Sequence, residues 1–160
     1  MKAIMTRKKK NDKGFSLIEL IIASAILVIL TGLLAPNILR YVEKSREAKD
    51  MQTLDTVYEA AQIALTEENL TIADKYNYGA TLPETLTADK EDATTKTLEG
   101  QMALTLGSQK LSLVSKACKG KSIKLQVNVK DNAVKVWVAD GNDIVKSSDG
   151  RLFQVPADTK

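Results

Sequence analysis

The carboxylate of Glu19 is the group in this 160-residue chain whose type and position most directly indicate chemistry. It is the only charged residue between Lys13 and Arg40, in a segment that is otherwise apolar or neutral. An ionised carboxylate inside an apolar helix costs about 2–4 kcal/mol unless it is paired or reaches the polar interface. No Lys or Arg lies within helical reach of Glu19 inside the run. The position therefore indicates either an ion pair with another chain or a side chain that extends toward the interface near Lys13.

A cut between Gly14 and Phe15 would supply the missing cation. Phe15 would become the first residue, and its α-ammonium group would need an anion. Glu19 of one subunit and the Phe15 amine of a neighbour would then satisfy each other. Such a head-to-tail contact between side-by-side helices propagates into a helical filament unless it closes.

The segment Lys13-Gly14-Phe15-Ser16-Leu17-Ile18-Glu19-Leu20 resembles the class III signal of type IV pilins and the related pseudopilins. The shared features are a short basic leader, a Gly, a Phe, and a Glu at the fifth position after the cut, followed by a long apolar helix. Gly32 and Pro36 within that helix are also similar to the family. The motif covers residues 8–36.

The resemblance implies a structural subunit without catalysis or cofactor of its own. A prepilin peptidase would cut between Gly14 and Phe15 and N-methylate Phe15. The mature subunit would wait in the membrane until an assembly ATPase and a platform protein drew it into a filament with copies of itself and minor pilins. Two alternatives stay open: a pseudopilin of a type II secretion or competence system, and a single-pass anchored extracellular domain that binds a ligand and never polymerises.

A single membrane-spanning helix must position these groups. Leu20 to Leu39 is a run of 20 residues without a charge, and at about 1.5 Å per residue it spans a hydrocarbon core of about 30 Å. The basic leader, residues 1–14, keeps the N-terminus in the cytoplasm and places residues 40–160 outside. The run is longer than a secretory signal needs, and Leu33 to Pro36 gives no small-x-small cleavage site, which favours retention. The resemblance implies a cell-surface filament after assembly.

Gly32 and Pro36 predict a kink or local melting near residues 31–37, because Pro removes a backbone donor and Gly weakens the same turn. This flexibility would let residues 15–39 adapt between bilayer and filament core. The alternative is that Pro36 merely kinks a static anchor.

The fold class predicted for the chain is α+β, with a long N-terminal helix packed on a small antiparallel sheet. Residues 40–67 are predicted to form an amphipathic helix. The apolar stripe along one side of this helix consists of Met51, Leu54, Tyr58, Ala61 and Leu65. Residues 68–101 are predicted to be a surface loop, with a helical turn at 87–90. This loop is either a lateral contact of the filament or an irregular solvated segment.

Residues 102–160 are predicted to form the antiparallel sheet of the head. Short candidate strands lie at 102–106 and 111–113, and a third strand follows at 152–155. A central hairpin is predicted from the period-two pattern of Ile123, Leu125, Val127 and Val129 and then of Val134, Val136 and Val138.

Other chemistry is excluded or weakly indicated. The chain has no His, which excludes Ser-His-Asp triads and His-ligated zinc, and its single Cys, Cys118, excludes an internal disulfide. No metal site is expected, although Asp140, Asn142, Asp143 and Asp149 are weak candidates for calcium in a spacing that is not an EF-hand. The lysines near Cys118 are predicted to be a solvated face. Nucleic-acid binding is not expected, because the basic excess is confined to the leader.

Overall fold

The computed structural model describes residues 14–86, 96–107 and 110–156. The chain divides into two compact units, residues 1–40 and 41–160. We call the described part of the first unit (14–40) the stem and the second unit the head, and we describe each by itself.

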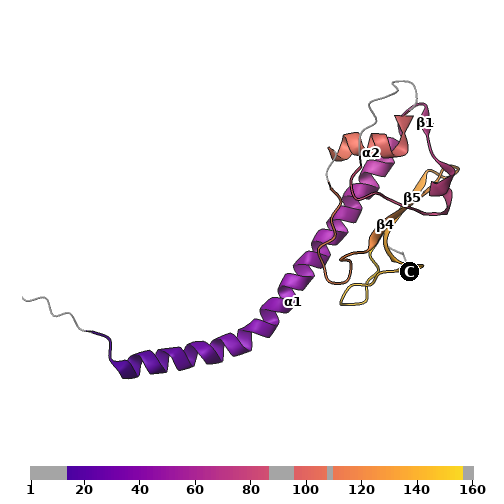
Figure 1. Cartoon of the computed structure of the whole chain (residues 1–160). Helices are drawn as coiled ribbons and strands as arrows, with labels where there is room; N and C mark the ends of the chain where they lie inside the picture. The colour runs from indigo at the N-terminus through magenta and orange to yellow at the C-terminus, as the bar shows by residue number, and fades with distance from the viewer. Residues whose placement is uncertain (1–13, 87–95, 108–109, 157–160) are drawn as a thin grey trace, which may run out of the picture. The chain divides into compact units, whose positions relative to one another are not determined.

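A single helix, α1 (Leu17–Ala64), contributes to both units (Figure 1). Every described residue of the stem is exposed, including large apolar side chains such as Leu17, Leu27 and Leu39. The helix is long and apolar enough to cross a membrane, with a mean hydropathy of 2.6 over its most apolar stretch. The stem has no core of its own, so its apolar surface needs lipid or other helices as its partner.

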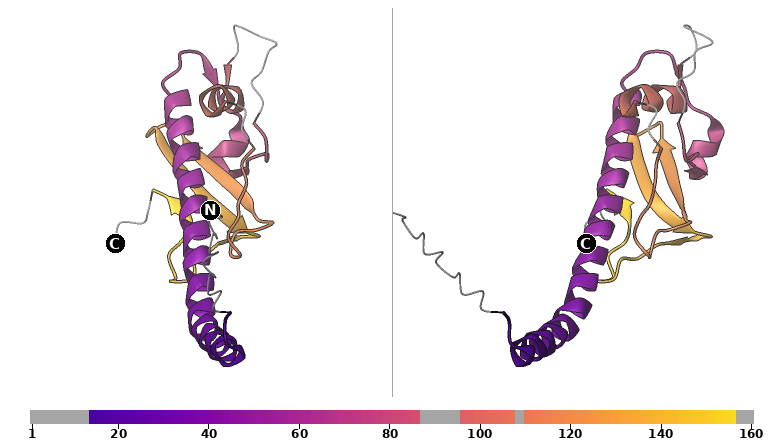
Figure 2. Two further views of the ribbon diagram at one scale, coloured as in Figure 1. Left: turned by 90° about the vertical axis from the view of Figure 1, so that its left-hand side faces the viewer. Right: turned by 60° about the vertical axis from the view of Figure 1, so that its left-hand side comes forward.

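The second half of α1 belongs to the head and buries one of its faces against the rest of that unit (Figure 2). The predicted stripe is confirmed: Leu54 and Ala61 are fully buried, and Met51, Tyr58 and Leu65 pack partly buried against the core. The buried face is wider than predicted, and its additional members are Val57, Ala60 and Ala64.

The sheet on which this helix packs is antiparallel, so the predicted α+β class is confirmed. Its strand order is β2 (Ala80–Thr81), β4 (Ser122–Asn128), β5 (Ala133–Asp140) and β6 (Asp143–Ile144). A further strand, β7 (Gln154–Val155), also pairs with β5. A second, two-stranded parallel pair joins β1 (Leu70–Thr71) to β3 (Lys96–Thr97).

The β4–β5 hairpin has the register that the alternating pattern predicts. Leu125 lies opposite Val136 and Val127 lies opposite Val134, all four buried, because residues two apart share a face of a strand. The prediction for Val129 is wrong, since it lies in the turn after β4 and is 55% exposed.

The segment predicted as a surface loop, 68–101, supplies a substantial part of the core. Its buried apolar residues are Tyr76, Leu82, Leu86 and Leu98. Tyr76 belongs to the 3₁₀ helix η1 (Asp74–Tyr78), and its hydroxyl donates to the carboxylate of Glu99. The loop prediction is therefore wrong for these residues, whose apolar spacing is too irregular to reveal burial. The predicted turn at 87–90 lies outside the described residues.

The strand predicted at 102–106 is also wrong, because these residues belong to helix α2 (Leu98–Leu106). Thr97 caps its first turn by accepting a hydrogen bond from the Gly100 amide, and Gly107 ends it in the left-handed conformation. Leu98, Met102 and Leu106 repeat every four residues, which is the spacing of one face of a helix. The alternation of Met102, Leu104 and Leu106, on which the strand prediction rested, is no stronger a pattern. Residues 111–113 form no strand either, and only Lys110 bridges, to Thr85.

Candidate functional site

The first turn of α1 places the Glu19 carboxylate beside the start of the helix. The Ser16 carbonyl accepts the first helical hydrogen bond, from the Leu20 amide at 3.2 Å. Oε2 of Glu19 accepts a hydrogen bond from the Ser16 backbone N–H at 2.9 Å. Ser16 and Glu19 therefore occupy the N-cap and N3 positions of the helix, where a Glu side chain satisfies one of the unpaired backbone donors.

This capping interaction was not predicted, although the spacing Ser16-x-x-Glu19 is its sequence signature. A carboxylate in the first turn is also favoured by the positive end of the helix dipole. The cap uses Oε2, and no described residue bonds the other oxygen, Oε1. The same carboxylate can therefore cap its own helix and accept a hydrogen bond from another chain.

Gly14 and Phe15 lie outside the helix, in a segment without regular secondary structure that ends at Ser16. Phe15 is 89% exposed, and a Cβ atom built on Gly14 would meet no atom within 4 Å. Nothing within the described chain requires a glycine at position 14. The peptide bond between these residues is accessible to a processing enzyme. A requirement for glycine at position 14 would therefore reflect the specificity of that enzyme.

Two hydroxyl groups within the stem helix, those of Ser24 and Thr31, are satisfied by the helix itself. Ser24 Oγ donates to the Ile21 carbonyl and Thr31 Oγ1 to the Leu27 carbonyl, both at 2.8 Å. Such bonds let a polar side chain lie in an apolar environment without a partner from another helix. Glu19 thus remains the stem group with the strongest requirement for an external partner, since it alone carries a charge before Arg40, the last residue of the stem.

Pro36 lies inside α1, and the helix continues past it to Ala64. A Cβ atom built on Gly32 would meet nothing within 4 Å. The predicted flexibility of this turn therefore stays a prediction.

The comparisons with known proteins identify the same segment. A family model described as the prokaryotic N-terminal methylation motif matches residues 9–35. The chain carries a type IV pilin-like class III signal. No curated protein and no solved structure matches this chain. The signal and the apolar helix fit a membrane-anchored precursor of the pilin and pseudopilin type.

Three carboxylates on α1 beyond the signal hold loops of the head. Asp50 is fully buried and accepts hydrogen bonds from the Val114 amide at 2.7 Å and from the amide and hydroxyl of Ser115 at 2.9 and 2.5 Å. Glu47, 8% exposed, accepts from the amide and hydroxyl of Ser148 at 2.9 and 3.0 Å. These charge-assisted bonds fix two loops that are distant in sequence to one helix.

Glu43 extends this row one turn closer to the stem. Its Oε1 accepts a hydrogen bond from the Lys116 amide, and its Oε2 lies 3.5 Å from Arg46. This row was not predicted, because Glu and Asp in this region of the helix also suit a solvated face. The signal available was their spacing of four and three residues, which places all three carboxylates on one side of a helix.

A groove of about 900 Å³ lies between α1 and the C-terminal loop of the head. Its walls include Lys44, Lys146 and Arg151, and its apolar lining includes Met51 and Phe153. The buried side-chain amide of Gln154, which also belongs to the wall, makes no hydrogen bond with any residue that the structure describes.

Two of the four weak calcium candidates, Asp140 and Asp149, have side-chain partners in the head. Asp140 lies 2.9 Å from Lys121 Nζ, and the hydrogen bond from Ser147 lowers the pKa of Asp149. The backbone of Asp143 in β6 lies opposite that of Asp140 in β5, and Asn142 lies in the turn between them. Among the described residues, no group of three or more His, Cys, Asp or Glu side chains is arranged to hold a metal ion.

Cys118 is fully buried beside Ser115, and burial raises the pKa of its thiol to about 11. A thiol that stays protonated at neutral pH is a poor nucleophile. Of the neighbouring lysines, Lys110 pairs with Glu84 at 3.0 Å, whereas Lys116 and Lys119 are exposed and have no ion pair among the described residues.

Proposed function

We propose that this chain is a structural subunit of a type IV pilus-like filament. It is processed between Gly14 and Phe15 and polymerised through its stem. The observation that carries the proposal is a charged carboxylate, Glu19, on the first turn of a helix whose other described stem residues are exposed and uncharged up to Leu39. The family model that matches residues 9–35 supports the same conclusion.

The proposed assembly contact is a charge pair between subunits. After cleavage, Phe15 carries an α-ammonium group one residue before the helix cap. Oε1 of a neighbour's Glu19 accepts a hydrogen bond from that group while Oε2 keeps its own cap. Because the two partners lie on different subunits, each subunit offers one donor and one acceptor, and the contact repeats along a helix.

The partners of the proposed subunit follow from this role. They are a prepilin peptidase, an assembly ATPase, a platform protein, further copies of the chain and minor pilins. The precursor spans the cytoplasmic membrane with its N-terminus inside, and the assembled form is a cell-surface filament. The proposed subunit has no catalytic activity of its own.

Two substitutions of Glu19 separate its capping role from the charge pair. Glu19→Gln keeps a carbonyl oxygen that can accept from the Ser16 amide but removes the charge, whereas Glu19→Ala removes both. We expect both variants to be processed and both to lower the yield of sheared filaments more than tenfold. Glu84→Gln, at an exposed position in the head, is the matched control and should leave the yield unchanged.

The outcomes distinguish the two roles. Wild-type yield from Glu19→Gln with loss in Glu19→Ala would show that the carboxylate acts only as a helix cap and would contradict the charge pair. Wild-type yield from both variants would show that Glu19 has no role in filament assembly.

A further inference from the structure

The charges of the head are segregated along α1. From Met51 to Asp74 the sequence holds five acidic residues and no basic one, and the four that carry this argument are Asp55, Glu59, Glu68 and Asp74. All four are exposed, and none has an ion pair among the described residues. We call these four residues the acidic end. It lies around the distal part of α1 and the segment that follows the helix.

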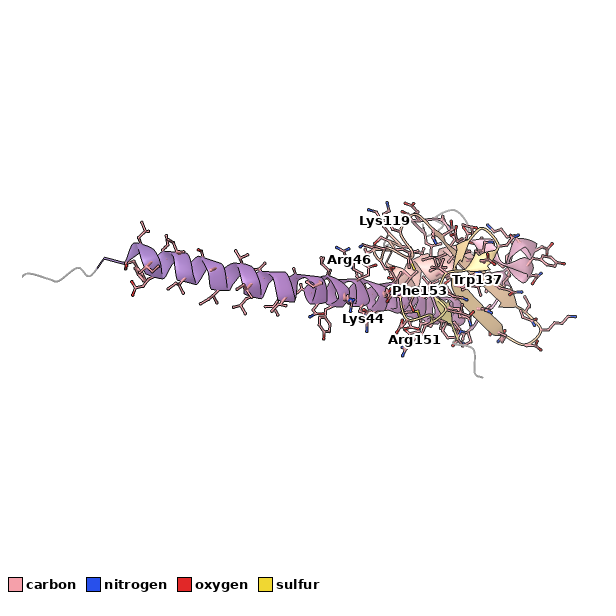
Figure 3. All side chains as sticks on the ribbon, turned by 90° about the horizontal axis from the view of Figure 1, so that it is seen from below. Lys44, Arg46, Lys119, Trp137, Arg151 and Phe153 are labelled. Atoms are coloured by element: carbon pink, nitrogen blue, oxygen red, sulfur yellow. The ribbon has the colours of Figure 1, made fainter. Side chains whose placement is uncertain are left out.

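The opposite charge gathers at the other end of the head, around the first head residues of α1. Its exposed members are Lys44, Arg46, Lys116, Lys119, Lys146 and Arg151, which we call the basic end. They come from three segments distant in sequence, and Figure 3 shows Lys44 and Arg151 on one side of α1 and Arg46 and Lys119 on the other. The head thus presents cations on both sides of the helix.

The row of carboxylates on α1 explains why these three segments meet. Glu43 binds the amide of Lys116, and Glu47 binds Ser148 in the loop that carries Lys146 and Arg151. The carboxylates of this row are turned toward backbone donors, and Glu47 is nearly fully buried. The lysine and arginine head groups are left at the surface, where Lys44, Lys146 and Arg151 border the groove together with Asp149. Arg151 lies 3.8 Å from Asp149 and Arg46 lies 3.5 Å from Glu43, whereas Lys44 and Lys146 have no ion pair among the described residues.

We propose that the basic end of one head docks on the acidic end of a second copy of this chain, with the groove receiving the partner's acidic residues. The two surfaces are complementary and lie on the same molecule. Along α1, Lys44 and Ala64 are separated by about 30 Å at 1.5 Å per residue, so one head cannot satisfy both ends by itself. A contact between unlike surfaces of identical chains is heterologous and propagates.

This inference rests on the proposed filament, in which one rotation and one rise relate every subunit, and so every head, to the next. Parallel heads that are offset along their length bring the basic end of one to the acidic end of another. Anionic phospholipid headgroups are a different partner for the basic end, but a lipid surface leaves the exposed acidic end unexplained. The second copy accounts for both ends.

Charge reversal tests the docking contact in the full-length chain. Lys44→Glu with Lys146→Glu should lower the yield of sheared filaments at least tenfold, and so should Glu59→Lys with Glu68→Lys. Combining all four changes in one chain restores opposite charges across the contact and should return the yield to within about threefold of wild type. Lys130→Glu, in the turn after β4, is the matched control and should have no effect.

Each result decides the proposal. Unchanged yield from the paired reversals, with normal wild-type filaments, would overturn the docking contact and leave the proposed filament intact. Loss without rescue would also overturn it and assign the basic end to another anion. Binding of the wild-type chain, but not of the Lys44→Glu and Lys146→Glu variant, to phosphatidylglycerol vesicles would identify that anion as lipid. A wild-type chain that forms no filament would overturn both proposals.

Discussion

The stem and the head share one helix but differ in where their side chains find partners. Leu27 in the stem is 64% exposed, whereas Leu54, 27 residues later on the same helix, is completely buried. The head closes its apolar face with its own sheet, and the stem leaves its apolar surface open. A helix that is apolar all round within a chain that does not cover it takes its partners from a membrane or from other chains.

The carboxylates differ in the same way. Asp50 in the head accepts three hydrogen bonds from groups of its own chain, and both of its oxygens take part. Glu19 in the stem accepts one. The chemistry of the head is therefore internal and structural, while the stem keeps an acceptor for another molecule.

The largest expected effect on the head follows from Asp50. Asp50→Ala leaves the Val114 amide and both donors of Ser115 buried without a partner, and we expect the free energy of unfolding to fall by about 3 kcal/mol or more. Urea unfolding of the detergent-solubilised chain, followed by Trp137 fluorescence, measures this change. Asp55→Ala, at an exposed position one turn away, should change it by less than about 0.5 kcal/mol. Equal losses of stability from Asp50→Ala and Asp55→Ala would contradict a stabilising role for the hydrogen bonds that Asp50 accepts.

Two matched leucines test the contrast between the regions directly. Leu54→Ala should destabilise the head by about 2–5 kcal/mol, because it opens a cavity in a closed core. Leu27→Ala should leave head unfolding unchanged, because no described residue packs over it. The same urea titration measures both variants. A comparable loss from Leu27→Ala would mean that the head depends on the stem for its stability.

A smaller effect is expected at Gly79, which joins η1 to β2. Its φ is 87°, and a Cβ atom built there would lie 2.7 Å from the ring of Trp137. Gly79→Ala must strain the backbone and displace the indole, so we expect a loss of about 1–3 kcal/mol and a shifted Trp137 emission maximum. Gly150→Ala has a similar φ but open space around it, and it should leave the emission unchanged.

The sequence predicted those parts of the fold that follow from regular patterns. The stripe at Leu54 and Ala61 and the β4–β5 hairpin were predictable because their apolar residues repeat with the period of a helix or of a strand. Helix α2 was mistaken for a strand because Met102, Leu104 and Leu106 alternate with the period of a strand. Met102 and Leu106 also continue a four-residue repeat from Leu98, but that repeat and the caps at Thr97 and Gly107 were overlooked. The burial of Tyr76 depends on contacts between distant segments, which no local pattern encodes.

The candidate site was predictable for a different reason. Gly14, Phe15 and Glu19 form a motif in which residue type and spacing are both specific, and the family model matches the same segment. The capping bond to Ser16 was readable from the sequence but was overlooked in favour of the ion pair. The contacts of Glu43, Glu47 and Asp50 with loops of the head were not predicted, because a carboxylate on an amphipathic helix is usually solvated.

The most direct test of the proposed function is the intact mass of this protein in sheared surface filaments and in membranes of the native cell. We predict that a chain beginning at Phe15 and carrying one added methyl group is abundant in the sheared filaments. The same processed chain confined to the membrane would indicate a pseudopilin or a rare minor subunit instead of a pilus subunit. A chain that begins at Met1 in both fractions would contradict processing, and with it the assembly contact between Phe15 and Glu19.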